Sequence, residues 1–211
     1  MTGFKADVYH RRSLRLKGYD YSQAGLYFIT VCCQDRACLL GDVILGEMVL
    51  NDAGNMIHKQ WLKLSQRFNH IQLHEYVVMP NHFHAIIEII PVDTLCINSS
   101  ICTNQNNTDI QYQHNVGIPL VGIQNNAIQK GQPQGLPLRK TIGDILDAFK
   151  SITTVEYIRG VNTKNWPSFN RRLWQRNYYE HIIRHEQSYQ NLSEYICNNP
   201  TTWTDDKFYQ T

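Results

Sequence analysis

The sequence predicts an α+β fold in which helices cover an antiparallel sheet. Two kinds of segment alternate along the chain: short stretches rich in aromatic and β-branched residues, and longer stretches with an apolar residue every three or four positions. A turn signal, Pro80-Asn81, separates two of the short stretches and favours a hairpin. Because hairpins alternate with helices, we expect the strands to pair antiparallel and the helices to pack on their sheet.

Length and composition limit the class of protein. The 211 residues suit one domain, spanning 1–211, with a core large enough to fold alone. The formal net charge of +2 is small, so any nucleic-acid interpretation depends on where the basic residues lie. The six cysteines form no Cys-x-x-Cys pair and fit no zinc ribbon or finger. The polar start and the lack of a run of about eighteen apolar residues predict a cytoplasmic protein without a membrane span.

The short apolar stretches give the predicted strands. They cover 26–33, two pieces within 38–50, 71–79 and 82–90. We expect the 71–79 and 82–90 strands to form a hairpin at the middle of the sheet. Residues 178–183 fit either a strand or a short helix.

Three stretches have the apolar spacing of amphipathic helices. They cover 52–68, 142–159 and 186–198. Asn51 or Asp52 offers an N-cap for the first helix. Thr141, with Asp144 three residues later, resembles a capping box for the second, and Gly160 is expected at its C-terminal end.

The segment 92–137 interrupts this pattern. It is crowded with Asn and Gln and nearly lacks charged residues. Such a segment buries too little apolar surface to offset the entropy lost on ordering, so we expect a disordered insertion. Apolar residues such as Ile118 and Leu120 leave an interaction arm as the alternative.

The sequence His82-Phe83-His84 is a candidate metal site. In a strand, residues i and i+2 point to the same face, so the two imidazoles start about 6.5 to 7 Å apart and can converge on one ion. Phe83 then points into the opposite layer. A lone His-x-His is a weak motif, and two ordinary polar side chains on a strand are the alternative.

The last predicted helix offers a third ligand and a nucleophile. Leu192, Tyr195, Ile196 and Asn199 fall on one helical face. An Asn carbonyl oxygen suits Mg²⁺ or Mn²⁺, and a phenol beside a metal-bound phosphate can act as a nucleophile. Twelve tyrosines occur in the chain, so a ring that simply packs in the core is the alternative for Tyr195.

Four runs of residues resemble the single-tyrosine HUH transposases, and in particular their repeat-associated (REP-associated) tyrosine transposase branch. They are VVMPNHFHAIIEI (77–89), WQRNYYEHIIR (174–184), EYICNNP (194–200) and RRSLRLKGYDYSQAGLYFITVCCQDRACLLG (11–41). Together they cover most of the chain outside 92–137, an insertion that departs from the family pattern.

The resemblance implies a fold, a reaction and a set of site residues. The fold would be ferredoxin-like, and the reaction would be cleavage and transfer of single-stranded DNA near a hairpin or palindrome. His82, His84 and Asn199 would hold Mg²⁺ or Mn²⁺, although imidazole ligands also suit zinc. Tyr195 would form a 5′-phosphotyrosine link. The protein would be a monomer or a homodimer.

Basic residues gather at three places that could contact DNA. The predicted contacts are Arg11, Arg12, Arg15, Lys17, Lys150, Arg176 and Arg184. The cluster at 11–17 is expected on the backbone of a DNA hairpin, and the last group is interleaved with aromatic residues that can stack on bases. Two other functions stay open: a non-catalytic DNA-binding protein derived from a transposase, and a metal-dependent phosphodiesterase that uses water.

Overall fold

A computed structural model of the chain describes residues 18–91 and 140–209. The predicted insertion at 92–137 lies outside these residues. Within them, four strands form the main sheet: β1 (Gly25–Cys32), β4 (Ile71–Val78), β5 (His82–Ile89) and β6 (Tyr179–Ile183). Residues 178–183, which fitted a strand or a helix, therefore contribute a strand.

The order of strands in the main sheet is β4-β5-β1-β6, and every neighbouring pair is antiparallel. With one helix after β1 and another after β5, the chain follows the β-α-β-β-α-β path of a ferredoxin-like fold. The predicted antiparallel sheet and ferredoxin-like character are thus confirmed. The β4–β5 hairpin is also confirmed, but β4 is an edge strand, and only β5 lies inside the sheet.

A small hairpin and the helices complete the described fold. β2 (Gly41–Ile44) pairs with β3 (Glu47–Leu50). The helices are α1 (Asp52–Leu62), α2 (Leu64–Arg67), α4 (Ile142–Lys164) and α5 (Glu186–Asn198), with short 3-10 turns η1 (Gln34–Arg36) and η2 (Trp203–Asp205). None of these helices in the described ranges is long and apolar enough to cross a bilayer.

Two predicted helix boundaries needed correction. The expected 52–68 helix is divided at Lys63, whose angles (φ −75°, ψ −11°) remain right-handed, so the apolar face continues from α1 into α2. The second helix runs through Gly160 to Lys164. Gly160 lies within α4, where the Trp166 ring occupies the place that a side chain would take, and the helix ends instead at Asn165 in the left-handed conformation. Asn51 and the Thr141–Asp144 capping box start their helices as predicted.

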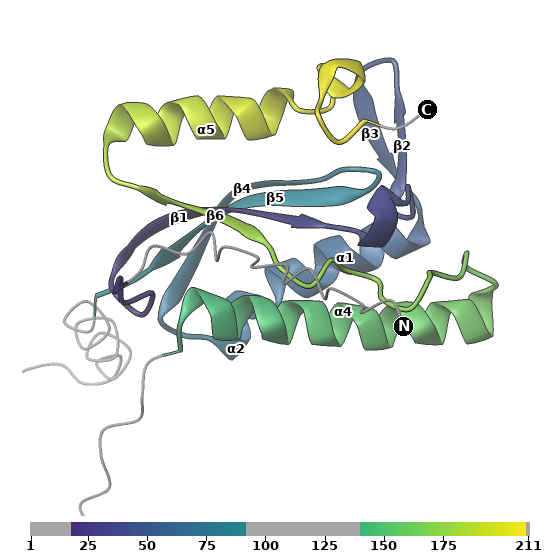
Figure 1. Cartoon of the computed structure of the whole chain (residues 1–211), viewed down its shortest axis with the longest axis horizontal. Coiled ribbons are helices and arrows are strands. Elements are labelled where there is room, and N and C mark those ends of the chain that lie inside the picture. The colour runs from purple at the N-terminus through teal and green to yellow at the C-terminus, as the bar shows by residue number, and fades with distance from the viewer. Residues whose placement is uncertain (1–17, 92–139, 210–211) are drawn as a thin grey trace, which may run out of the picture.

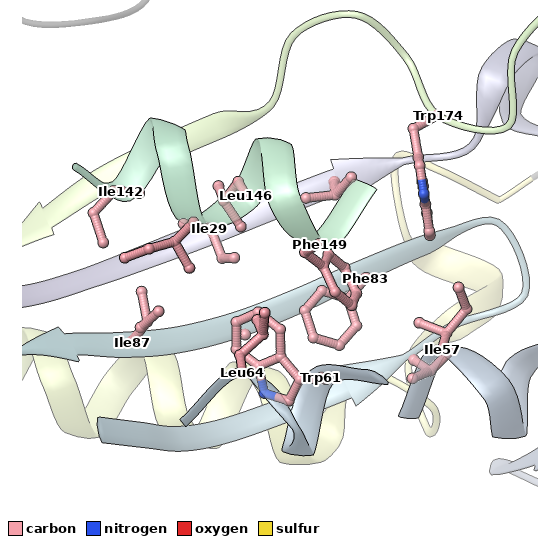
Figure 2. Packing of buried hydrophobic residues seen from close by; sticks show 14 of the residues in the cluster. Ile29, Ile57, Trp61, Leu64, Phe83, Ile87, Ile142, Leu146, Phe149 and Trp174 are labelled. Carbon is pink, nitrogen blue, oxygen red and sulfur yellow. The ribbon is translucent and has the colours of Figure 1, made fainter. Parts of the chain in front are cut away.

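The sheet separates two layers of helices (Figure 1). α1 and α4 cover one face, and α5 lies across the other. The main core fills the α1/α4 side, where the rings of Trp61, Phe83 and Phe149 meet at centroid distances of 4.8 to 5.4 Å (Figure 2). The opposite face buries far fewer apolar groups, so it has room for polar side chains.

Gly54→Ala is expected to lower the free energy of unfolding by about 1–3 kcal/mol. Gly54 is buried in α1, and an added methyl group would overlap the Leu40 carbonyl oxygen and lie 2.9 Å from a methyl carbon of Leu50. Strain against backbone outweighs the gain of about 1 kcal/mol in helix propensity. Urea denaturation measures the change.

Lys59→Ala, at an exposed position of the same helix, is the matched control and should stay within about 0.5 kcal/mol of the parent. Equal stability of the Gly54→Ala variant and the parent would mean that α1 does not pack against Leu40 this closely.

Candidate active site

His82 and His84 point to the α5 side of the sheet from its inner strand β5. Their cross-strand partners on β1 are Cys32 and Thr30. Phe83, between them, points into the main core, as the alternation of a strand requires. Both imidazoles are almost fully buried (0% and 1% exposed), and their ring centroids are 4.5 Å apart. The predicted convergence of the two side chains is therefore present.

Hydrogen bonds orient both imidazoles. The Nδ1 atom of His84 lies 2.8 Å from the Thr30 hydroxyl, and Nδ1 of His82 lies 2.9 Å from Oδ1 of Asn81. The Asn81 amide nitrogen donates to the carbonyl oxygens of Arg36 and Phe208, which fixes the amide so that its oxygen faces His82. Nδ1 of His82 must then carry the proton, which leaves a lone pair on Nε2.

Helix α5 brings Tyr195 and Asn199 to the same place. The Tyr195 hydroxyl lies 3.3 Å from Nε2 of His84, and it donates to Oδ2 of Asp206 at 3.3 Å. The Asn199 amide nitrogen donates to the same oxygen at 3.1 Å. Asn199 is fully buried, whereas Tyr195 is 37% exposed, so the phenol faces both the imidazoles and the surface.

Asp206 is the residue that sequence reasoning missed. It follows η2, where its backbone amide donates to the Trp203 carbonyl and its Oδ1 accepts from the Phe208 amide. Ligand atoms of His82, His84 and Asp206 all lie within 4.8 Å of one another, so the three form a group that could hold a metal ion. No periodicity marks Asp206 in the sequence, and only the fold brings it to the histidines.

Two buried atoms fit the presence of a cation. Nε2 of His82 and Oδ1 of Asn199 have no hydrogen-bond partner in the described part of the chain. Leaving such atoms unpaired is costly, and a ring nitrogen and an amide oxygen are both metal donors. The unpaired atoms belong to two of the three ligands that the resemblance implies, and Nε2 of the third, His84, faces the Tyr195 hydroxyl.

Burial sets the charge states in this site. It lowers the pKa of His82 to about 4, although the Asp206 carboxylate acts in the opposite direction, and it lowers the pKa of His84 well below its ordinary value. Both rings are therefore neutral near pH 7, the form that binds metals. Burial, with Asp206, raises the pKa of Tyr195 to about 12, so the phenol holds its proton until an acceptor takes it.

The predicted DNA-binding residues do not all lie at this site. Arg11, Arg12, Arg15 and Lys17 fall outside the described residues. The Lys150 ammonium donates to the carbonyl oxygens of Gln175 and Arg176 at 2.7 and 2.9 Å, so DNA would have to compete with both bonds. The side chains of Arg176 and Arg184 are exposed. Contact of these residues with DNA stays a prediction.

A curated bacterial protein is similar to this chain over nearly its whole length. A protein of Haemophilus influenzae (strain Rd) that is uncharacterised is 40% identical to this chain over 208 residues, which is 99% of this chain and 98% of that protein. The chain belongs to the family of this Haemophilus protein. No family profile matches the chain.

Two solved structures are also similar. One is a REP-associated tyrosine transposase bound to a REP hairpin, with 16% identity and a TM-score of 0.45 over 87% of this chain and 70% of that chain. The other is a candidate transposase of Deinococcus radiodurans R1, with 13% identity and a TM-score of 0.41 over 87% of this chain and 95% of that chain.

A β-bulge helps to attach α5 to the sheet. In β4, Leu73 pairs with Ile87 and Tyr76 pairs with Ala85, so His74 and Glu75 together oppose one residue of β5. In a regular strand, adjacent residues point to opposite faces. Here the side chains of His74 and Glu75 both contact residues of α5. The bulge therefore doubles the number of polar groups that β4 offers to this helix.

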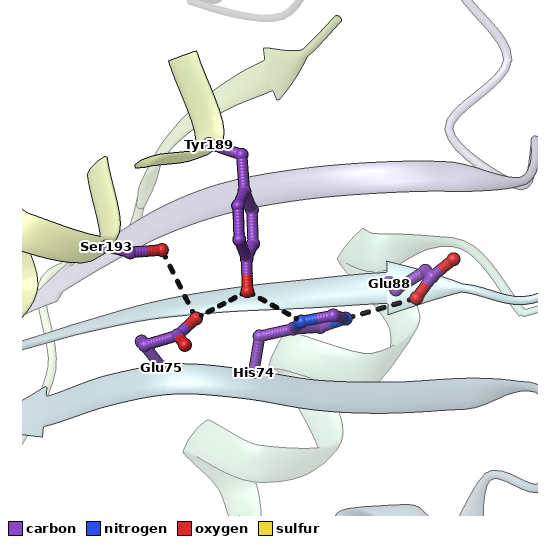
Figure 3. Close-up of polar contacts among 5 residues, drawn as sticks. All are labelled: His74, Glu75, Glu88, Tyr189 and Ser193. Atoms are coloured by element: carbon purple, nitrogen blue, oxygen red, sulfur yellow. Dashed lines mark hydrogen bonds and ion pairs between the residues drawn. The ribbon is translucent and has the colours of Figure 1, made fainter. Parts of the chain in front are cut away.

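Figure 3 shows the polar chain that results. Glu75 accepts from the hydroxyls of Tyr189 (2.9 Å) and Ser193 (3.3 Å), both on α5. His74 lies 3.2 Å from the Tyr189 oxygen and 3.1 Å from Glu88. Since Tyr189 donates its one proton to Glu75, its oxygen is left to accept a hydrogen bond from Nδ1 of His74. Ser193 is two residues before Tyr195, so this chain fixes the part of α5 that carries the phenol.

Glu75→Gln is expected to lower the free energy of unfolding near neutral pH, by an amount that shrinks in acid. Burial alone raises the pKa of Glu75, but bonds from its own amide, Tyr189 and Ser193, with the charge of His74, bring it below the ordinary 4.5. A pKa that is lower in the folded state stabilises it above about pH 4.5, and the contribution is lost as the pH falls through the folded value. Urea denaturation across this range measures the difference.

Glu194→Gln is the control, because Glu194 is an exposed glutamate on the same helix. Its free energy of unfolding should stay within about 0.5 kcal/mol of the parent. A difference for Glu75→Gln that is the same at pH 7 and in acid would contradict the role given to the Glu75 charge.

Proposed function

We propose that this chain is a metal-dependent, single-tyrosine DNA strand transferase of the transposase class, acting on single-stranded or hairpin DNA. One observation carries the proposal: a partly exposed phenol, Tyr195, stands 3.3 Å from both His84 Nε2 and the Asp206 carboxylate. The four sequence runs that resemble the REP-associated branch point to the same residues.

His82, His84 and Asn199 would hold the ion. Two of the donor atoms, Nε2 of His82 and Oδ1 of Asn199, are the buried atoms left without a partner among the described residues. An amide oxygen among the ligands suits the hard cations Mg²⁺ and Mn²⁺. When bound, such a cation polarises the scissile phosphate and offsets the charge that develops on it.

Asp206 would take the proton of the nucleophile. Its Oδ2 already accepts from the Tyr195 hydroxyl and from Asn199, so it is satisfied without an ion. The Tyr195 oxygen attacks phosphorus and forms a Tyr–O–P bond while its proton moves to Asp206. The P–O3′ bond breaks, and the leaving oxygen takes up a proton from solvent water to become a free 3′-hydroxyl. The energy of the phosphodiester is kept in the phosphotyrosine link.

Strand transfer is the reverse of this step with another strand. A 3′-hydroxyl attacks the phosphotyrosine and gives its proton to solvent water, a new P–O3′ bond forms, and the Tyr–O–P bond breaks. Asp206 returns the proton to the Tyr195 oxygen, which restores the site. Water is not needed as a nucleophile at either step.

Tyr195→Phe is expected to abolish a covalent protein–DNA adduct that the parent forms with single-stranded hairpin oligonucleotides in Mn²⁺. The phenyl ring keeps the packing against Phe28 and His84 but has no oxygen to attack phosphorus. Denaturing gels with 3′-labelled DNA measure the adduct. Adducts on the Phe variant would move the nucleophile to another tyrosine, with Tyr178, Tyr179 and Tyr189 next to be tested.

The same gels separate the other two functions. Cleavage without an adduct in the parent would indicate a phosphodiesterase that uses water. Binding without cleavage would indicate a non-catalytic DNA-binding protein.

Asp206→Asn is expected to slow adduct formation by about 10²- to 10⁴-fold, because the phenol loses its proton acceptor. Mn²⁺ affinity, measured by titration calorimetry, should change much less than in His82→Ala, for which a loss of at least about 10- to 100-fold is expected. Asp205→Asn, at the exposed neighbouring position, is the control and should match the parent in both measurements. An Asp206→Asn variant that loses Mn²⁺ as severely as His82→Ala would make Asp206 a ligand.

A further inference from the structure

A cavity of about 430 Å³ opens beside Tyr195 on the face of the sheet that α5 covers. Its walls come from β1, β6, α5 and the segment after η2, and they include Phe28, Tyr179, Asn191, Leu192, Tyr195 and Lys207. His84 also lines it, so the cavity is continuous with the candidate metal site. Its volume is in the range of small-ligand pockets. Whatever enters it lies directly beside the proposed nucleophile.

The register of the sheet explains where the cavity lies. Tyr179 on β6, Thr30 on β1 and His84 on β5 are directly opposite one another, and they form one row across the sheet. In the next row on the same face, Phe28 stands opposite His181. Phe28 is buried, whereas Tyr179 lies on the edge strand β6 and is 46% exposed. The floor of the cavity therefore runs from the metal site to an open edge of the sheet.

Aromatic rings form part of the walls. Phe28 stacks on His84 at 5.4 Å and meets Tyr179 and Tyr195 edge-on at 6.4 and 6.2 Å. The Tyr179 hydroxyl has no hydrogen bond among the described residues. Hydrogen bonding within this part of the protein therefore does not explain why a tyrosine stands at this position. Flat apolar faces next to solvent are the surfaces on which unpaired bases stack.

Charge and hydrogen-bonding groups surround these rings. The Lys207 ammonium lies 6.0 Å from the centre of the Tyr179 ring, at the mouth of the cavity, and attracts a phosphate. Asn191 and Ser188 supply an amide and a hydroxyl from α5. The Asn191 oxygen accepts from Gln187, and its amide nitrogen has no partner in the described part of the chain, so it is free to donate to an acceptor on a base.

We propose that this cavity binds one unpaired nucleobase, that of a nucleotide adjoining the phosphate that Tyr195 attacks. The inference rests on the proposed function, and it adds a subsite to it. The base stacks on Tyr179, Asn191 contacts its edge, and Lys207 pairs with the phosphate. Double-stranded DNA cannot place a base there without unpairing it, so the cavity selects single-stranded DNA at the cleavage point.

The first test uses a pool of single-stranded hairpin oligonucleotides with a randomised arm. Both products of the parent are sequenced, namely the fragment held on Tyr195 and the released fragment. We expect a base preference at one position that adjoins the cleaved phosphate. Tyr179→Leu should reduce this preference by about fivefold or more, since stacking on the ring is lost, and Tyr179→Phe should keep it. Equal preferences in the Leu and Phe variants would overturn the proposal.

A matched pair on α5 tests the polar wall. Asn191→Ala should change which base is preferred at that position, whereas Gln190→Ala, an exposed carboxamide outside the cavity, should leave the preference as it is in the parent. The same shift in both variants would mean that the cavity does not contact the base.

The second test does not depend on cleavage. Fluorescence of 2-aminopurine deoxyribonucleoside 5′-phosphate should be quenched by the parent, Tyr179→Phe and Tyr195→Phe proteins, and about fivefold or more weakly by Tyr179→Leu. Adducts that persist in Tyr195→Phe would contradict the proposed nucleophile while this quenching still supports the cavity. Adducts restricted to Tyr195, with quenching equal in all four proteins, would instead contradict the cavity alone.

Discussion

The alternation of side chains along β5 is the constraint on which the site depends. Phe83 is held in the main core by Trp61 and Phe149, so His82 and His84 must point to the other face. Strands β1 and β4 pair with the two edges of β5 and fix its register. A slip of one residue would turn the imidazoles toward the main core and Phe83 toward the opposite face. The packing that stabilises the fold thus also sets the direction of the histidines.

Helix α5 meets this face through few apolar contacts and several polar ones. Ile196 is its one buried residue in the described structure, and the chain from Glu75 through Tyr189 and His74 to Glu88 supplies a second attachment. A helix that packed fully against the sheet would close the space beside Tyr195. The polar attachment holds the helix in place and leaves that space open.

Local patterns in the sequence predicted most of the elements and much of the site. The His82-Phe83-His84 alternation and the Tyr195/Asn199 spacing depend on neighbouring residues, and the structure brings those four residues together. Asp206 could not be predicted, because it lies in an aperiodic segment that only the folded chain brings to β5. The position of β4 at the edge and the passage of α4 through Gly160 depend on strand order and on Trp166, which local periodicity does not encode.

The side-chain amide of Asn81 links the candidate metal site to the last residues that the structure describes. Its nitrogen is held by carbonyl groups of Arg36 and Phe208, and its oxygen thereby selects the tautomer of His82. Displacement of the segment that carries Phe208 would remove one of the two bonds that orient this amide. If the amide then rotated, His82 would turn a proton, rather than an electron pair, toward the cation. The orientation of a lone pair on the first residue of β5 is in this way tied to the docking of the segment that follows η2.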